Sequence, residues 1–267
     1  MNQASAPALP AGVLVFGPPG AGVPAVTAAL TRAGVAAAGW EGGPEPHLAA
    51  DPDNLTPGQS PVLLALEAAD GTCLERTVPP WAERQLSTGA AQAVRQLAET
   101  RERLFAARLR ADVLLDSTHL TASVLSARAR QLDLVLGPLP AEKPVVVVES
   151  FGYPRGVPLD LGWCVDTRAL RNPFWEPSLR MLSGLDPRVR DFVLGQHLAA
   201  KIVQDLESLV ASLLPELQAR SRRTLRLAVG CTGGYHRSVA IAEELGGRLG
   251  TQGLSVLIWH RDLPERP

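Results

Sequence analysis

The chain has 267 residues, with 26 basic and 27 acidic side chains, so its formal net charge is −1. This balance excludes a global attraction to nucleic acid or anionic lipid, and any RNA contact would need a local basic patch. The first residues, MNQASAPALPAG, lack the basic and apolar parts of a signal peptide, and no apolar run reaches the ~18 residues of a transmembrane helix. Cys73, Cys164 and Cys231 lie far apart, which predicts neither a disulfide framework nor a metal site. We therefore expect a cytoplasmic protein without membrane contact, long enough for two domains.

Short apolar runs alternate with helical patterns in the first half, which is typical of α/β architecture. We predict helices over Pro24–Ala33 and Ala90–Arg110, the second with Val94, Leu97, Leu104 and Leu109 on one apolar face. Residues 39–61 are rich in Gly, Pro and Asp and are predicted to be a loop. The predicted strands are Val13–Phe16, Val62–Leu66 and Val113–Leu115.

Three prolines in Leu136–Pro144 indicate a linker, which divides the chain into domains at 1–140 and 141–267. After it we predict a strand at Val145–Val148 and an irregular segment over Pro154–Pro187. Asp186 and Pro187 favour a helix start. The long helix that follows carries the apolar stripe Ile202, Leu206, Leu209 and Leu213, and Pro215 is predicted to end or kink it. The last predicted elements are a strand at Leu225–Val229, a helix at Arg237–Leu249 and a strand at Leu254–Ile258.

The first predicted strand leads into a loop with the glycine spacing of a Walker A motif, carried by Gly17, Gly20 and Gly22. Val23 stands where the motif has the lysine that contacts phosphates, and Pro24 stands where it has the hydroxyl that holds Mg²⁺. We favour a turn that has kept the P-loop shape and lost most of its affinity for nucleotide. We expect no Lys or Arg from another segment, such as Arg76, to replace the missing lysine.

The second loop, Gly230–Ser238, also joins a predicted strand to a predicted helix. Gly233 and Gly234 allow the backbone to point several N–H groups inward, Thr232 and Ser238 add hydroxyls, and His236 and Arg237 add cationic donors. A helix N-terminus with an arginine is suited to a phosphate monoester. The plain alternative is a glycine-rich turn in a non-catalytic scaffold.

The same loop fits the cysteine-phosphatase pattern, with Cys231 as nucleophile and Arg237 as phosphate clamp. Gly230 replaces the histidine that usually precedes that cysteine. No loop clearly presents an aspartate as general acid, although Asp160, Asp166 and Asp186 are candidates. This alternative makes the protein an enzyme, and we rank it below phosphate binding without catalysis.

The run GCTGGYHRSVAIAEEL at 230–245 resembles the C-terminal signature of the RapZ-like family of RNase adaptors and P-loop proteins. The resemblance continues through SFGYPRGVPLD at 150–160, VDTRALRNPFWEPSLRMLSGLDPRVRDFV at 165–193 and HRDL at 260–263, and more loosely through the first half. It implies an N-terminal domain that binds and slowly hydrolyses ATP or GTP. It also implies a C-terminal domain similar to a sugar-phosphate-binding subdomain of phosphofructokinases, which senses an amino-sugar phosphate and binds a small RNA.

By this resemblance, Cys231–Ser238 is the phosphosugar loop, with Asn172 near the sugar, and homo-oligomers are expected. The chain departs from the family at Val23 and Pro24, in lacking an Asp-Val-Arg strand end, and at Phe174, where a histidine is frequent. Candidate RNA contacts are the basic residues Arg220, Arg222 and Arg223, next to Arg226, with His260 and Arg261. Solvated surface charge is the simpler interpretation of that cluster. We expect a cytoplasmic regulator that binds a phosphorylated metabolite, with impaired ATP or GTP binding and a small RNA or a regulatory protein as partner.

Overall fold

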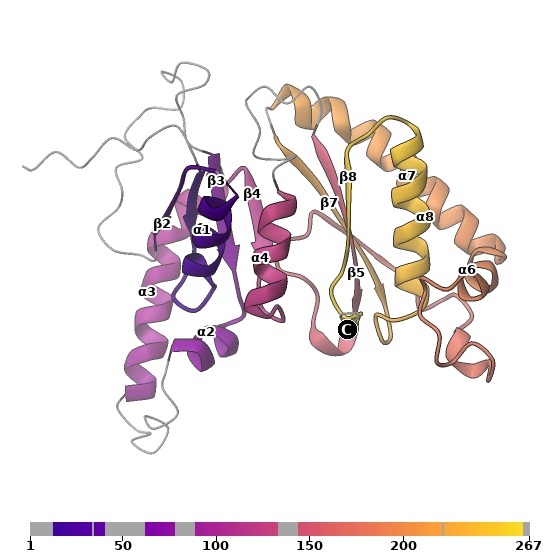
Figure 1. Ribbon diagram of the computed structural model, residues 1–267, viewed down its shortest axis with the longest axis horizontal. Coiled ribbons are helices and arrows are strands. Elements are labelled where there is room, and N and C mark those ends of the chain that lie inside the picture. The colour runs from indigo at the N-terminus through magenta and orange to yellow at the C-terminus, as the bar shows by residue number, and fades with distance from the viewer. Residues whose placement is uncertain are drawn as a thin grey trace, which may run out of the picture. The chain divides into compact units, whose positions relative to one another are not determined.

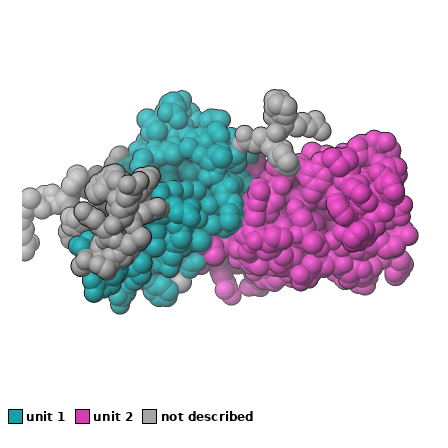
Figure 2. Space-filling view, turned by 90° about the horizontal axis from the view of Figure 1, so that it is seen from below, with its two compact units in different colours: residues 1–139 teal, residues 140–267 magenta. Residues whose placement is uncertain are grey.

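Two separate parallel sheets organise the chain in the computed structural model, which describes residues 13–33, 35–40, 62–77, 89–132, 144–220 and 222–263. The chain divides into two compact units, residues 1–139 and residues 140–267, coloured teal and magenta in Figure 2. Among the described residues, no helix is both long enough and apolar enough to cross a membrane. The fold is therefore α/β, with one four-stranded sheet in each unit.

The sheet of the first unit has the strand order β2-β1-β3-β4, and every neighbouring pair is parallel. Its central strands are almost wholly apolar and buried, as expected when helices cover both faces of a parallel sheet. Helix α3 packs on one face through Leu104 and Ala107, and α1 packs against α4. The elements are β1 (Val13–Phe16), α1 (Val23–Arg32), β2 (Ala37–Trp40), β3 (Val62–Glu67), α2 (Asp70–Thr77), α3 (Gly89–Arg110), β4 (Val113–Asp116) and α4 (Ala122–Gln131).

The sheet of the second unit has the order β6-β7-β5-β8 and is also parallel throughout. One apolar core joins β5 and β7 to three helices, α6, α7 and α8, which lie along the same side of the sheet (Figure 1). The elements are β5 (Val145–Gly152), η3 (Tyr153–Arg155), β6 (Trp163–Asp166), η4 (Pro173–Trp175), α6 (Pro187–Leu194), α7 (His197–Ala219), β7 (Thr224–Cys231), α8 (Arg237–Thr251) and β8 (Val256–His260).

Two predicted loops contain strands. Residues 39 and 40 belong to β2, which pairs with β1, and a Cβ at Gly39 would lie 2.9 Å from Val23 Cγ1, so the glycine lets α1 approach the sheet. Strand β6 lies inside the segment predicted to be irregular. Among the described strands it pairs with β7 alone, and it is largely exposed, so it lacks the apolar run of a central strand.

The predicted long helix is two helices. Gln196 adopts an extended conformation with φ −86° and ψ 129°, which separates α6 from α7. Asp186 caps α6 as expected, because its carboxylate accepts the N–H of Arg188 at 3.0 Å. Pro215 does not end α7, which continues to Ala219, because Leu213, Leu214 and Leu217 pack against the core on both sides of the proline.

Three further outcomes concern the first unit. Val94 does not share the buried face of α3, since it is 52% exposed, whereas Leu97 and Leu104 are buried as predicted. The Leu109 side chain and most of the predicted linker, residues 136–143, lie outside the described residues. Helices α2 and α4 were not predicted, and α2 carries Arg76, a side chain that contacts the first glycine loop.

Candidate functional site

The loop between β7 and α8 is shaped by two glycines with different requirements. Gly234 has φ +68°, and a Cβ there would lie 2.6 Å from the backbone nitrogen of Gly152 at the end of β5. Gly233 faces open space, because a Cβ there would have no neighbouring atom within 4 Å. Gly234 is therefore required for packing, whereas Gly233 leaves room beside the loop.

Cys231 is the last residue of β7, and its buried sulfur is held by the loop. Its Sγ accepts the N–H of Gly234 at 3.2 Å and lies 3.1 Å from Ser238 Oγ. Burial alone would raise the pKa of Cys231. Hydrogen bonds from the Ser238 side chain and from the N–H groups of Ser238, Gly234 and Gly233 outweigh burial and lower the pKa below its usual value. The amides thus converge on one point and stabilise negative charge there.

Arg237, the first residue of α8, is only 4% exposed and ties the loop to the segment that follows β6. Its Nη1 donates to the carbonyl oxygens of Arg168 at 3.0 Å and Leu170 at 2.9 Å, and its Nη2 donates to Thr232 Oγ1 at 3.0 Å. Its Nε is buried and has no hydrogen-bond partner within the described residues. The guanidinium therefore keeps one buried donor that the described residues do not satisfy.

His236 does not provide the second cation that its position suggested. Its ring is buried, and Nε2 lies 3.1 Å from the carbonyl oxygen of Arg180. Burial lowers the pKa of His236, so the ring is neutral near pH 7 and donates to that carbonyl. Tyr235 contacts the same segment, because its hydroxyl donates to the carbonyl oxygen of Met181 at 3.3 Å. These bonds fix the loop against residues 180–184.

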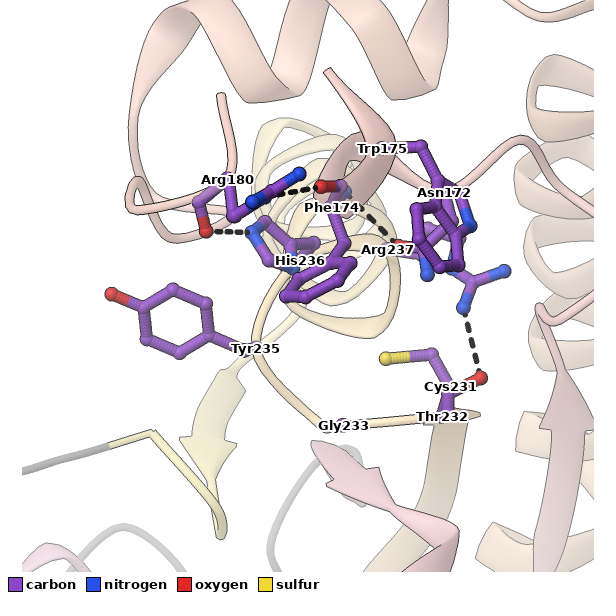
Figure 3. A pocket seen from close by; sticks show the side chains of 10 residues that line it. All are labelled: Asn172, Phe174, Trp175, Arg180, Cys231, Thr232, Gly233, Tyr235, His236 and Arg237. Atoms are coloured by element: carbon purple, nitrogen blue, oxygen red, sulfur yellow. Dashed lines mark hydrogen bonds between the residues drawn. The ribbon is translucent and has the colours of Figure 1, made fainter. Parts of the chain in front are cut away.

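A cavity of about 480 Å³ opens above this loop (Figure 3). It brings together most of the residues predicted to bind a phosphorylated metabolite, including Asn172, which comes from a distant part of the sequence. Gly234 and Ser238 do not line it and instead pack beneath it. The lining residues are Asn172, Phe174, Trp175, Arg180, Cys231, Thr232, Gly233, Tyr235, His236 and Arg237.

Sequence reasoning missed Trp175, Arg180 and Tyr235 as lining residues. The signal available was the run NPFWEPSLR, in which aromatic and basic residues directly follow Asn172. Asn172 itself caps η4, because its Oδ1 accepts the N–H of Phe174 at 3.3 Å. The cap turns the chain so that Phe174 and Trp175 reach the cavity.

Two features of the structure weigh against the phosphatase alternative. A Cβ at Gly230 would lie 2.6 Å from Phe151 Cζ, so the histidine of the phosphatase pattern could not be accommodated there. None of the three candidate aspartates lines the cavity. Each forms an ion pair with an arginine, namely Asp160 with Arg226, Asp166 with Arg168 and Asp186 with Arg188.

The predicted basic cluster is not a surface patch. Arg223, Arg226 and Arg261 are all buried, with exposures of 3%, 7% and 8%. Arg226 pairs with Asp160 at 2.6 Å, and Arg261 Nη2 donates to the carbonyl oxygens of Gly152 and Gly156.

His260 is also held inside the unit. Its two ring nitrogens lie 2.8 Å from Ser150 Oγ and 3.0 Å from Glu243 Oε1. Of the residues expected to contact RNA, only Arg220 and Arg222 are exposed, and Arg220 lies 3.9 Å from Glu216.

The glycine loop of the first unit joins β1 to α1 as predicted, with Gly20 and Gly22 at φ +83° and +95°. The expectation that no basic side chain reaches it is wrong. Arg76, on α2, donates from Nη1 to the carbonyl oxygen of Gly20 at 3.0 Å and from Nη2 to that of Leu120 at 3.0 Å. A guanidinium therefore supplies positive charge at the loop, which removes one argument for its loss of anion affinity.

Two residues around the loop are nevertheless engaged with other parts of the unit: the one at the Walker lysine position and the acidic one at the end of the neighbouring strand β3. Val23 is 1% exposed, so it belongs to the core of the unit. Glu67, at the end of β3 next to the loop, pairs with Arg101 at 2.9 Å and with Arg108. A Mg²⁺ ion would have to compete with two arginines for that carboxylate.

Taken together, these features define a two-unit α/β protein. The first unit has a P-loop-like turn, and the second has a glycine-rich loop whose amides and buried arginine are arranged as in oxyanion sites.

Residues 144–264 match the RapZ C-terminal domain family. Relatives named nucleotide-binding protein extend the match into the first unit. One from Corynebacterium jeikeium is 36% identical over 217 residues, covering 79% of this chain and 71% of the relative. One from Parafrankia is 40% identical over 208 residues, covering 77% and 70%, and one from Saccharopolyspora erythraea is 38% identical over 215 residues, with the same coverage. The chain belongs to the RapZ-like family.

Proposed function

We propose that this chain is a RapZ-like regulator whose second unit binds a phosphorylated small molecule in the cavity above the Cys231–Ser238 loop. The observation that carries the proposal is that Arg237 lines the cavity and that its buried Nε has no hydrogen-bond partner within the described residues. An unsatisfied buried charged donor costs free energy, and a phosphate oxygen would satisfy it. The α8 N-terminus and the exposed Thr232 hydroxyl add donors on the same side.

The amides that now stabilise the Cys231 sulfur support the same conclusion. They lower the pKa of Cys231 despite burial, so the local field favours an anion. A phosphate group bound above the sulfur would meet that same field. Asn172 at the cavity edge provides a neutral donor and acceptor for the part of the ligand beyond the phosphate.

The experiment uses Gly233, because its missing side chain faces open space at the cavity. Gly233→Asp would place a carboxylate beside the bound phosphate, and Gly247→Asp, on the exposed side of α8, is the matched control. Calorimetry should detect phosphomonoester binding to the unmodified chain and to Gly247→Asp. Binding to Gly233→Asp should weaken at least about tenfold, since like charges a few ångströms apart repel by about 1–4 kcal/mol. Equal affinity of the two variants, or no binding of any phosphomonoester at millimolar concentration, would contradict the proposal.

The first unit is proposed to bind ATP or GTP poorly. Val23 and Pro24 supply neither the lysine nor the hydroxyl of a Walker A loop, and Glu67 is paired with arginines. The family relatives are named nucleotide-binding proteins, so the test is to measure the binding of Mg-ATP and Mg-GTP to the full chain. Micromolar affinity would overturn this part.

A protein partner or a second copy of the chain is a better candidate than RNA for the target of this regulator. Only Arg220 and Arg222 of the candidate RNA contacts are exposed, so few phosphates could be neutralised. We expect RNA binding to be weak and to vanish with added salt. Nanomolar, sequence-selective RNA binding at physiological salt would refute this expectation.

The phosphatase alternative is supported by one observation, the lowered pKa of Cys231. The absence of an aspartate among the lining residues weighs against it. Hydrolysis of p-nitrophenyl phosphate that is lost in Cys231→Ser would establish this second function in place of simple binding.

A further inference from the structure

The segment that follows β8 holds both backbone polar groups of Gly152, the last residue of β5. Asp262 accepts the Gly152 N–H at 2.6 Å, and Arg261 Nη2 donates to the Gly152 carbonyl oxygen at 3.0 Å. Arg261 and Asp262 also bond to each other, with Nη2 2.9 Å from the carboxylate, and both side chains are almost fully buried. Because each peptide group is planar, the Arg261–Asp262 pair fixes the orientation of the peptides on both sides of Gly152.

Gly152 and Asp262 in turn hold the loop after β7. Gly152 is paired with Cys231 in the register of the sheet, and a Cβ on Gly234 would lie 2.6 Å from the Gly152 nitrogen. The same Cβ would lie 2.8 Å from Asp262 Cβ, so Gly234 packs directly against both residues. The N–H of Gly234 donates to Cys231 Sγ at 3.2 Å. A small displacement of Gly152 or Asp262 would therefore turn one of the N–H groups that stabilise negative charge in the loop.

The negative charge of Asp262 is offset by two arginines. Burial alone would raise the pKa of Asp262, but hydrogen bonds from Arg261 and from the Gly152 N–H, together with the charges of Arg261 and Arg155, outweigh burial and lower the pKa. Asp262 is therefore ionised near pH 7. Arg155 Nη1 lies 3.2 Å from Asp262 Oδ1. Because two positive charges surround one negative charge, the carboxylate can accept hydrogen bonds next to an anion site without repelling the anion strongly.

We propose that Asp262 is a positioning residue for the phosphate-binding loop, which acts through Gly152 to hold the N–H of Gly234 in the orientation that favours an anion. This inference rests on the proposed function and deepens it, since it assigns a residue that controls the geometry of the site. Asp262 does not line the cavity, so its effect is separate from contact with the ligand. The inference also gives a role to Arg261, a predicted RNA contact that is buried.

The test compares Asp262→Ala with Val210→Ala in the full chain. Val210 is buried in the apolar core of the same unit, on α7, and does not line the cavity, so its variant lowers stability from another part of the unit. Two quantities are measured under conditions in which both variants are folded. One is the calorimetric affinity for glucose 6-phosphate and phenyl phosphate, and the other is the pH dependence of Cys231 alkylation by iodoacetamide.

Asp262→Ala should weaken phosphomonoester binding about tenfold, the effect of losing one hydrogen bond to a charged group. It should also move the alkylation profile of Cys231 to higher pH, because the Gly234 N–H then stabilises the thiolate less well. Val210→Ala should change neither quantity. Asp262→Asn keeps one of the two acceptor oxygens, so it should change both quantities in the same direction and by less. This second variant decides the question if Asp262→Ala does not fold.

The inference is overturned if the folded Asp262 variant keeps the affinity and the alkylation profile of the unmodified chain, because Asp262 would then contribute to stability alone. Equal changes in Val210→Ala would also overturn it, since any loss of stability would then have the same effect. If neither phosphomonoester binds the unmodified chain, that result contradicts the proposed function. The alkylation profiles then still decide whether Asp262 positions the loop.

Discussion

Gly152 and Gly234 lie so close together that neither position can hold a side chain. A Cβ on Gly152 would be 2.8 Å from the Gly234 nitrogen, and a Cβ on Gly234 would be 2.6 Å from the Gly152 nitrogen. The pair joins the end of β5 to the loop that follows β7, and β5 and β7 are neighbouring strands in the sheet. Asp262 completes this junction by accepting the N–H of Gly152 at 2.6 Å.

Gly234→Ala should destabilise the second unit by about 1–3 kcal/mol, because it adds both a clash and a strained positive φ. Gly233→Ala, one residue earlier, adds the same methyl group in open space and should change stability by less than about 1 kcal/mol. Urea unfolding of the two variants checks the difference. Equal midpoints for the two variants would show that Gly234 is not packed against Gly152 as tightly as these distances indicate.

Arg237→Ala should weaken phosphomonoester binding by about 1.5–3 kcal/mol, the range for a hydrogen bond to a charged group. It should also destabilise the unit, because the carbonyl groups of Arg168 and Leu170 lose their donor. Arg180→Ala should weaken binding with a smaller loss of stability, since the Arg180 side chain is exposed. Calorimetry with matched unfolding curves separates the two effects. Unchanged affinity in Arg237→Ala would remove this residue from the site.

Alkylation by iodoacetamide should distinguish Cys231 from Cys164. The pKa of Cys231 is lowered by its hydrogen bonds, whereas partial burial raises the pKa of the Cys164 thiol. Because the thiolate is the reactive form, the rate at each cysteine should rise with pH to a plateau. The rise for Cys231 should occur at a lower pH than the rise for Cys164. Peptide mass spectrometry gives both profiles from one sample. Phosphate should slow only the reaction of Cys231, and an inflection at or above that of Cys164 would contradict the assignment.

His236 should make the second unit less stable in mild acid. Burial lowers its pKa in the folded state below the ordinary value of about 6.5, so the unfolded chain takes up the proton first. Stability is therefore fully present above about pH 6.5 and falls as pH decreases toward the folded-state pKa. His236→Gln, which can still donate to the Arg180 carbonyl, should remove this part of the loss. The test compares urea midpoints at about pH 7.5 and 5.5 for the two proteins.

Arg76→Ala should destabilise the first unit by about 1–3 kcal/mol, because carbonyl groups of the glycine loop and of the segment after β4 lose a shared charged donor. Glu75→Ala, at an exposed neighbouring position on the same helix, is the control. Thermal unfolding followed by circular dichroism measures both. If the two variants unfold at the same temperature, Arg76 does not brace the loop.

The sequence by itself determined the α/β class, both strand–loop–helix units and the family. These features depend on local patterns, namely buried apolar runs, glycine spacing and the residues GCTGGYHRS, which are legible without knowledge of distant contacts. Strand β6 escaped prediction because an edge strand with one neighbour needs no continuous apolar run. Helix propensity likewise placed Asp186 and Pro187 correctly but did not reveal the break at Gln196.

Only the tertiary structure decided which charged residues are exposed and which partners they have. Arg220, Arg222, Arg223 and Arg226 look alike in the sequence, yet two of them are buried and two are exposed. Arg76 reaches Gly20 from 56 positions further along the chain. Asn172 and Trp175 reach the loop after β7 through folding of a segment with little regular structure. Charge and hydrogen-bond partners act over a few ångströms in space, so they depend on contacts between residues far apart in the chain, which no local pattern encodes.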